Sequence, residues 1–238
     1  MSAASTSALD PTSPIELVLF DLDGTLTDSA PGILAGFDHA LTSVGTPLPG
    51  DDVRAHVVGP PMIDTFRSLG LTEDQIERAR TAYSEYYEGR GWAENRVYDG
   101  IVDVLDALVE AGIPMAVATS KNERVARRIL EHFDLAKYFE FVAGASDDGS
   151  RRAKSDVVAR ALAEVGRDAR ATAHGGTASV VMVGDRDHDV FGAGHWGIPV
   201  VLVGWGYGLS SEHAAASWSV ASTPDLTSLL AGLTGNPS

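Results

Sequence analysis

Five short runs of apolar and β-branched residues recur along the chain and predict the strands of a single sheet. In each run apolar residues follow one another instead of alternating with polar ones, which is typical of strands buried on both faces of a parallel sheet. Segments with an apolar residue at every third or fourth position lie between the runs and predict helices. This alternation indicates a doubly wound α/β core. The five runs are IELVLF (15–20), IPMAVAT (113–119), FEFVAGA (139–145), SVVMVG (179–184) and IPVVLVG (198–204).

One interval of the chain breaks the alternation. From Pro31 to Arg96 there is no strand-like run, and apolar residues such as Ile33 and Phe37 recur at helical spacing. We therefore expect a helical insertion after the first strand, joined to the core by two crossings. The expected organisation is a core of residues 15–30 and 97–238 with a small helical cap of residues 31–96.

The amino-terminal residues 1–14 are rich in Ser, Ala, Thr and Pro, and we expect them to form a flexible tail. They have no basic start and no long apolar stretch, so they do not resemble a signal peptide. The apolar runs elsewhere are far shorter than the roughly 20 residues of a membrane-spanning helix. These features predict a soluble, cytoplasmic protein.

The overall charge narrows the possible partners. The 238 residues include 33 Asp and Glu against 18 Lys and Arg, a formal net charge of −15. Nucleic acids and anionic membranes require a basic surface, so neither is expected as a partner. The absence of cysteine excludes disulfides and thiolate chemistry. Only Lys121, Lys137 and Lys154 are lysines, which makes a lysine beside an acidic site informative.

Polar residues with the chemistry of a catalytic site follow three of the expected strands. Ligands of an open parallel sheet bind beyond the carboxyl ends of its strands, so these residues are expected to converge on one crevice. Lys154 begins the helix that precedes the fourth strand and would add a cation. The first strand is followed by Asp21 and Asp23, the second strand ends at Thr119, Ser120 and Lys121, and the fourth strand is followed by Asp185, Asp187 and Asp189.

Several carboxylates in one crevice require a counter-ion, because like charges at short range raise one another's pKa. A hard divalent cation meets this need, and ligation by oxygen atoms alone favours Mg²⁺. Calcium loops of the EF-hand type fit the sequence poorly. A loop starting at Asp21 would have Gly32 at its twelfth position, and a loop starting at Asp185 would have Val190 and Trp196 where Gly and Glu are needed.

Taken in chain order, these motifs resemble those of the haloacid dehalogenase superfamily of phosphohydrolases. The helical insertion resembles the first cap type of that superfamily, and the resemblance extends from Ile15 to about Leu233. Within the superfamily the chain is similar to the phosphoglycolate phosphatase and 5′-nucleotidase branch, with VVGPPM (57–62) as a supporting feature. The matching motifs are DLDGTLTDS (21–29), VATSK (117–121), the lone lysine of RRAKSDV (151–157) and VGDRDHDV (183–190).

The resemblance implies roles for the carboxylates. Asp21 would be the nucleophile that forms an aspartyl-phosphate, and Asp23 would protonate the leaving oxygen and later activate water. Mg²⁺ would be held by the side chains of Asp21 and Asp185 and by the main-chain carbonyl of Asp23. Asp189 would orient these ligands without binding the ion itself. Asp187 is an additional acid without an implied role.

The phosphoryl group would be bound by uncharged and basic residues of the same motifs. Thr119 and Lys154 would bind its oxygens, the lysine as a fixed positive charge, together with Gly24, Thr25 and Ser120.

The resemblance therefore implies an Mg²⁺-dependent phosphatase acting on a small phosphorylated metabolite, such as a phosphoglycolate-like compound or a nucleoside monophosphate. The carboxylate of Asp23 favours phosphoryl chemistry over carbon–halogen cleavage, because the dehalogenases of the superfamily lack it. The cap is expected to determine which substrate fits. The candidate specificity residues of the cap are Arg54, His56, Arg67, Tyr83, Tyr86, Tyr87 and Trp92.

Two alternatives remain open. The segments DGTLTDS, VGPPM, AVATSK, AGASDDGS and VVLVGWGYG also resemble mycobacterial protein-tyrosine kinases built on the same fold. The chain has neither a Walker-type P-loop nor the glycine-rich loop of protein kinases to hold ATP. The other alternative is a weakly active protein that docks a partner through the cap or the acidic surface, although no sequence feature indicates a protein partner.

Overall fold

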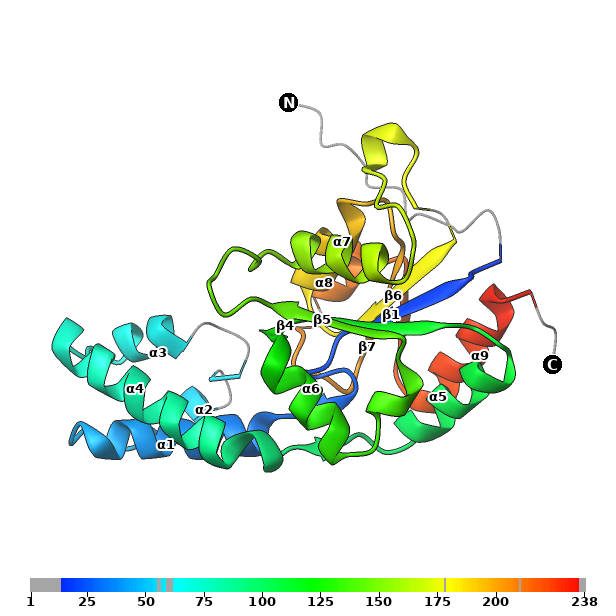
Figure 1. The fold of residues 1–238 in the computed structure, drawn as a ribbon. Helices are drawn as coiled ribbons and strands as arrows, with labels where there is room; N and C mark the ends of the chain where they lie inside the picture. Colours follow the sequence, from blue (N-terminus) through cyan, green and yellow to red (C-terminus); the bar gives the residue numbers. More distant parts are fainter. Residues whose placement is uncertain (1–13, 55–56, 59–61, 178, 210, 236–238) are drawn as a thin grey trace. The chain divides into compact units, whose positions relative to one another are not determined.

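A computed structural model describes residues 14–54, 57–58, 62–177, 179–209 and 211–235 (Figure 1). The expected tail, Pro14 excepted, lies outside these residues. The chain divides into two compact units, one formed by residues 1–27 and 97–238 and the other by residues 28–96. We call them the core unit and the helical unit. None of the helices in the described part of the chain has the length and apolar character needed to cross a membrane.

The core unit is built on a six-stranded sheet in which all neighbouring strands are parallel. The strand order is β5-β4-β1-β6-β7-β8, and the predicted doubly wound α/β fold is confirmed. The sixth strand, β8, was not predicted because it is a short edge strand that is only partly buried. The strands are β1 (Leu17–Phe20), β4 (Met115–Asn122), β5 (Phe141–Ala145), β6 (Val180–Gly184), β7 (Val200–Val203) and β8 (Trp218–Val220).

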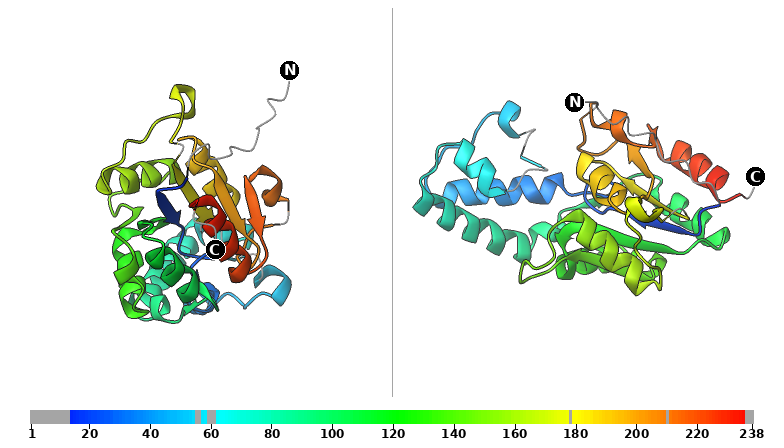
Figure 2. Two further views of the ribbon diagram at one scale, coloured as in Figure 1. Left: turned by 90° about the vertical axis from the view of Figure 1, so that its right-hand side faces the viewer. Right: turned by 90° about the horizontal axis from the view of Figure 1, so that it is seen from above.

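Helices cover both faces of this sheet. In Figures 1 and 2, α7 (Lys154–Glu164) and α8 (Asp187–Gly194) lie on one face, and α5 (Ile101–Glu110), α6 (Glu123–His132) and α9 (Thr223–Leu233) lie on the other. Leu17 and Leu19 belong to the apolar cluster that includes α7 and α8. The residues between them in β1 are buried as well, which explains the continuous apolar runs. Each fully buried Leu or Val side chain stabilises the fold by roughly 1.5–3 kcal/mol.

The order in which successive strands join the sheet reverses between β1 and β6. The connections from β1 lead to β4 and β5 on one side, and the chain then returns to the other side of β1 as β6. Ligands of doubly wound sheets bind at this point, beyond the carboxyl ends of the strands. Phe20 pairs with Val183 of β6 and with Val117 of β4. The residues that follow these strands therefore meet at one edge.

The helical unit packs around its own apolar cluster. It contains α1 (Ala30–Ser43), α2 (Asp51–Arg54), α3 (Met62–Ser68), α4 (Glu73–Gly89) and the 3₁₀-helix η1 (Gly91–Ala93). Phe37 of α1 stacks on Phe66 of α3 with 6.0 Å between ring centroids, and both side chains are fully buried. Thr72 begins α4 as the N-cap of a capping box with Gln75.

The chain leaves and re-enters the core through two short strands that pair with each other, β2 (Thr27–Asp28) and β3 (Arg96–Val97). Arg96 forms a 2.7 Å ion pair with Asp28 beside this pairing. The two crossings of the insertion are therefore neighbours in space.

A close backbone approach within the helical unit yields a stability prediction. A methyl group on Gly32 of α1 would overlap the carbonyl oxygen of Gly91, whereas one on Gly89 would meet no neighbouring atom within 4 Å. We expect Gly32→Ala to lower the free energy of unfolding by about 1–3 kcal/mol because the backbones must separate. Gly89→Ala, the control, should leave it unchanged or raise it by up to about 1 kcal/mol. Thermal unfolding of the intact chain measures both, and equal stability of the two variants would contradict the predicted contact.

Candidate active site

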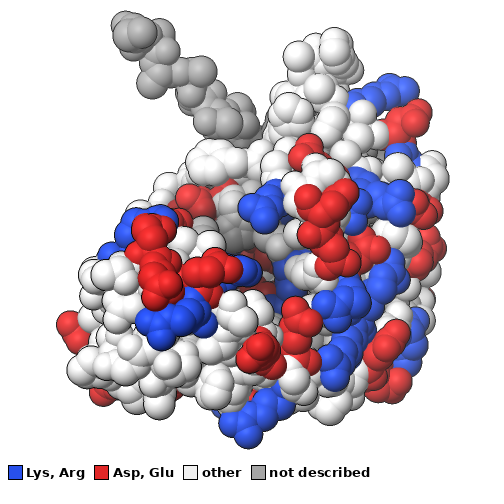
Figure 3. Space-filling model, turned by 60° about the vertical axis from the view of Figure 1, so that its left-hand side comes forward, with Lys and Arg blue, Asp and Glu red and all other residues white. Residues whose placement is uncertain are grey.

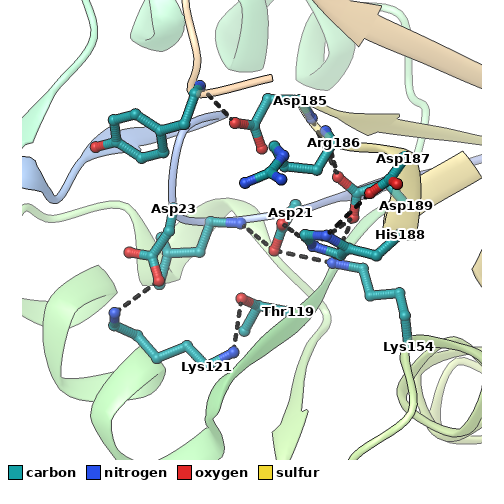
Figure 4. Close-up of polar contacts among 12 residues, drawn as sticks. Asp21, Asp23, Thr119, Lys121, Lys154, Asp185, Arg186, Asp187, His188 and Asp189 are labelled. Atoms are coloured by element: carbon teal, nitrogen blue, oxygen red, sulfur yellow. Dashed lines mark hydrogen bonds and ion pairs between the residues drawn. The ribbon is translucent and has the colours of Figure 1, made fainter. Parts of the chain in front are cut away.

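Asp21 follows β1 directly and lies at the centre of a buried polar cluster (Figure 4). Its side chain is almost fully buried. Oδ1 accepts a 2.8 Å hydrogen bond from the Leu22 N–H and lies 3.0 Å from Nζ of Lys154. A buried carboxylate is costly unless it is paired, and here the pairing cation comes from the first residue of α7.

Lys154 joins Asp21 to Asp189. Its Nζ lies 2.6 Å from Oδ1 of Asp189, while Oδ2 of Asp189 accepts the backbone N–H groups of Asp185 and Arg186 at 3.1 Å each. Burial alone would lower the pKa of Lys154, but the charges of Asp189 and Asp21 outweigh it and raise this pKa. Burial alone would raise the pKa of Asp189, but Lys154 lowers it. Lys154 and Asp189 therefore favour each other's charged form.

Asp185 follows β6 and is completely buried. Its Oδ2 accepts the N–H of Tyr207 at 2.7 Å, whereas Oδ1 has no hydrogen-bond partner among the described residues. Burial, reinforced by the charges of Asp189 and Asp21, raises the pKa of Asp185 to about 8. This carboxyl group thus lacks the counter-charge that Lys154 gives to the other two.

Lys121, which was expected at this crevice without a specific role, contacts both Asp23 and Thr119. Nζ of Lys121 lies 2.6 Å from Oδ2 of Asp23, and its backbone N–H donates to Oγ1 of Thr119 at 3.2 Å. The Thr119 side chain is buried at the end of β4. The signal in the sequence for Lys121 was the rarity of lysine in this acidic chain, together with its position two residues after Thr119.

The remaining predicted phosphate-binding residues differ in accessibility. Gly24 is buried with φ at +81°, a left-handed conformation that favours glycine. Thr25 is fully buried, and its Oγ1 has no hydrogen-bond partner among the described residues. Ser120 is exposed, so its side chain is not held within the buried cluster.

His188 is a further residue of the site, and no feature of the sequence pointed to it. Its Nε2 lies 3.9 Å from Oδ2 of Asp21 and 3.8 Å from Oδ1 of Asp189. These three residues can each offer one ligand atom within 4.8 Å of the others. Asp187, which had no implied role, is about half exposed and lies 4.0 Å from Nδ1 of His188.

Most candidate specificity residues of the helical unit contact one another or nearby acids. Arg54 pairs with Asp38, and the exposed Arg67 pairs with Asp64 and Glu73. The rings of Tyr83 and Tyr87 stack with 5.7 Å between centroids, while the Tyr86 hydroxyl donates to Glu94 at 3.0 Å. Trp92 is partly buried. His56 and residues 59–61 of the VVGPPM segment lie outside the described residues.

Most of the acid surplus lies on the surface rather than in this cluster. Asp and Glu side chains are intermixed with Lys and Arg on the face drawn in Figure 3. Exposed pairs one helical turn apart, such as Arg80–Glu77 and Arg78–Asp74, account for part of this mixing. Such pairs stabilise a protein by only about 0–1 kcal/mol, so the chemistry of the chain is concentrated in the buried set.

The sequence of the chain matches a known protein family. Residues 18–203 match the family model described as haloacid dehalogenase-like hydrolase. The chain belongs to the haloacid dehalogenase-like hydrolase family. The match includes both aspartate motifs, Thr119 and Lys154, so the resemblance inferred from the motifs is confirmed.

Three similar proteins place the chain within this family. It is 53% identical over 193 residues to the tyrosine-protein kinase PtkA of Mycobacterium tuberculosis, an alignment that covers 81% of this chain and 63% of PtkA. It is 37% identical to the 5′-nucleotidase of Pseudomonas aeruginosa, covering 82% of this chain and 85% of that protein. A predicted phosphatase from Clostridium acetobutylicum has a similar structure, with a TM-score of 0.80, 34% identity, and coverage of 92% of this chain and all of that chain. The chain thus spans less than two thirds of the length of PtkA.

The donor set fits the divalent cation that this family generally uses, Mg²⁺. Oδ1 of Asp185 and Oδ1 of Asp23 are buried and accept no hydrogen bond from the described residues. Burial and the charges of Asp189 and Asp21 raise the pKa of Asp185, and a bound cation would stabilise its charged form. Carboxylate and carbonyl oxygens are the ligands that Mg²⁺ prefers.

The buried ion pairs predict a stability difference between two lysine variants. Lys154→Met removes the cation shared by two buried carboxylates, so we expect a loss of about 3–5 kcal/mol in the free energy of unfolding. Lys137→Met, the control, removes an exposed pair with Asp134 and should cost no more than about 1 kcal/mol. Urea unfolding followed by circular dichroism compares them. Similar losses in both variants would mean that Lys154 does not stabilise the cluster.

Proposed function

We propose that this protein is a phosphatase that hydrolyses the phosphate monoester of a small metabolite through an aspartyl-phosphate on Asp21. The observation that carries the proposal is the position of Asp21. Its buried carboxylate lies where β1 ends, within 3.0 Å of the Lys154 ammonium, at the sheet edge where ligands of this fold bind. The family membership and the similarity to a 5′-nucleotidase support the same conclusion.

In the first half of the proposed reaction, an Asp21 oxygen forms a bond to phosphorus while the ester P–O bond breaks. Asp23 donates its proton to the leaving alcohol oxygen. Lys154 and Thr119 bind the phosphoryl oxygens, and the positive charge of Lys154 stabilises the transition state.

In the second half, Asp23 takes a proton from a water molecule whose oxygen then bonds to phosphorus. The P–O bond to Asp21 breaks, which releases inorganic phosphate and restores the Asp21 carboxylate. Lys121, whose Nζ lies 2.6 Å from Oδ2 of Asp23, pairs with the Asp23 carboxylate formed in the first half and holds it in place to accept this proton.

Asp21, the main-chain carbonyl of Asp23 and Asp185 would hold Mg²⁺, and Asp189 would support them through its hydrogen bonds to the backbone at Asp185. When bound, the ion supplies positive charge that offsets the repulsion between the acidic residues and an anionic substrate.

For the substrate we favour a phosphoglycolate-like compound or a nucleoside monophosphate, with the helical unit acting as the cap that selects it. The core residues act on the phosphoryl group alone, so the organic part of the substrate must be recognised elsewhere. A cap that closes over the bound substrate would also exclude bulk water from the aspartyl-phosphate.

Replacement of the nucleophile tests this proposal. Asp21→Asn should lower the rate of p-nitrophenyl phosphate hydrolysis at least ~10²-fold, because the group that bonds to phosphorus is lost. Asp187→Asn is the control, since it makes the same Asp-to-Asn change at an acid of the VGDRDHDV motif (183–190) that has no proposed role, and its rate should be unchanged. Unaltered hydrolysis by a correctly folded Asp21→Asn variant would refute the assignment of the nucleophile.

A second candidate function is phosphoryl transfer from ATP to a protein tyrosine. The 53% identity to PtkA favours it, and the same Asp21 carboxylate could receive the phosphoryl group from ATP and pass it on. The remainder of PtkA has no counterpart in this alignment, so its full activity does not transfer directly to this chain.

The fate of a labelled phosphoryl group separates the two functions. The purified protein is incubated with Mg²⁺, γ-³²P-labelled ATP and a tyrosine-containing protein, and released phosphate and labelled protein are counted separately. Phosphatase chemistry predicts label on inorganic phosphate alone, because water is the acceptor. Stable label on tyrosine that is lost in Asp21→Asn would establish the kinase function instead. If a panel of phosphorylated metabolites is also left intact, the weakly active partner-binding alternative gains support.

A further inference from the structure

The loop that follows β7, Trp205–Gly208, contacts Asp185 through its backbone. Its backbone N–H at Tyr207 donates to Oδ2 of Asp185 at 2.7 Å. This bond occupies one carboxylate oxygen, while the buried Oδ1 accepts none from the described residues. The loop thereby determines which oxygen of Asp185 remains available for another ligand.

Two glycines of the loop are required by contact with Asp185. A methyl group on Gly206 would overlap the Asp185 side chain and the carbonyl oxygen of Gly24, and one on Gly208 would overlap the Asp185 carbonyl oxygen. Neither glycine has a positive φ, so alanine is compatible with the backbone conformation at both positions. Glycine is needed at both positions because Asp185 lies too close for a side chain, not because the backbone conformation excludes alanine.

The same loop also contacts the turn that carries the nucleophile motif. Nε1 of Trp205 donates to the carbonyl oxygen of Thr25 at 3.2 Å, and the Trp205 ring makes an edge contact with Tyr98. A methyl group on Gly24 would overlap Oδ2 of Asp185 and approach the Tyr207 ring. The turn after β1 and the end of β6 are therefore joined through this loop.

We propose that Trp205, Gly206 and Gly208 are positioning residues for the divalent cation, because they fix the separation between Asp185 and the Asp21–Thr25 turn. The inference rests on the metal site of the proposed function and goes beyond it, since it assigns a role to residues that touch neither substrate nor metal. A loop of this kind sets metal affinity by orienting ligands that are already present.

Metal binding in the absence of substrate tests the inference. Gly206→Ala and Gly208→Ala should each raise the Kd for Mn²⁺, measured by electron paramagnetic resonance, about 10–100-fold. Gly194→Ala is the matched control, because a methyl group there meets no neighbouring atom within 4 Å although α8 begins beside the site. Its Kd should equal that of the wild type, and Asp185→Asn should abolish binding.

Folding of each variant is checked by thermal unfolding. If both glycine variants fold and bind Mn²⁺ within about twofold of the wild type, the inference is wrong. If they do not fold, Trp205→Phe decides, because it keeps an aromatic ring at this position and removes the indole N–H that donates to Thr25. Loss of that bond should raise the Kd about 2–10-fold, and an unchanged Kd would overturn the inference.

The readout is independent of the proposed activity. A wild-type protein that binds Mn²⁺ through Asp185 but hydrolyses no phosphate ester would refute the proposed function and leave the role of the loop intact. Wild-type protein that does not bind Mn²⁺, or an Asp185→Asn variant that binds it normally, would refute the role of the loop.

Discussion

The Lys154 ammonium, shared by Asp21 and Asp189, is the interaction on which the site depends. Without it two carboxylates would lie buried close together, and one of them would have to take up a proton. Because the cation stands at the first residue of α7 while the carboxylates follow β1 and begin α8, the pairing also joins three separate segments. The same two ion pairs of Lys154 therefore stabilise the fold and hold the side chains of the site in place.

The charges of the site are balanced in two ways. Asp21 and Asp189 pair with the Lys154 ammonium, whereas Asp185 accepts a backbone N–H at Oδ2 and its Oδ1 has no hydrogen-bond partner in the described part of the chain. In the proposed function, Lys154 would supply a fixed positive charge to Asp21 and Asp189, and a bound Mg²⁺ would supply one to Asp185. This division explains how a strongly acidic chain could bind an anionic substrate, because the positive charge needed for it is local.

The fold could be predicted from local patterns because each central strand is buried on both faces and therefore reads as a continuous apolar run. The edge strand β8 could not, since three partly exposed residues leave no such run. Among the site residues, Asp21, Asp185 and Lys154 were recognisable from motifs in a fixed order. His188 was not, since an isolated histidine has no pattern. The contact of Trp205 with Thr25 joins residues 180 positions apart, and no local pattern predicts such a pairing. Gly206 and Gly208 could not be predicted for a related reason: glycine is needed there because Asp185 lies close by, not because of the backbone angles of the two residues.

The pairing of β2 with β3 has a consequence for how this architecture can change. Since residues 28–96 leave and rejoin the core at adjacent points, the insertion is topologically a large loop, and its length and sequence do not alter the order of the six strands. If another domain replaced the insertion between β2 and β3, the buried ion pairs and the strand ends of the core unit would remain unchanged. If the insertion selects the substrate, as proposed, a change of substrate would require changes within residues 28–96 and none in the buried cluster of the core unit.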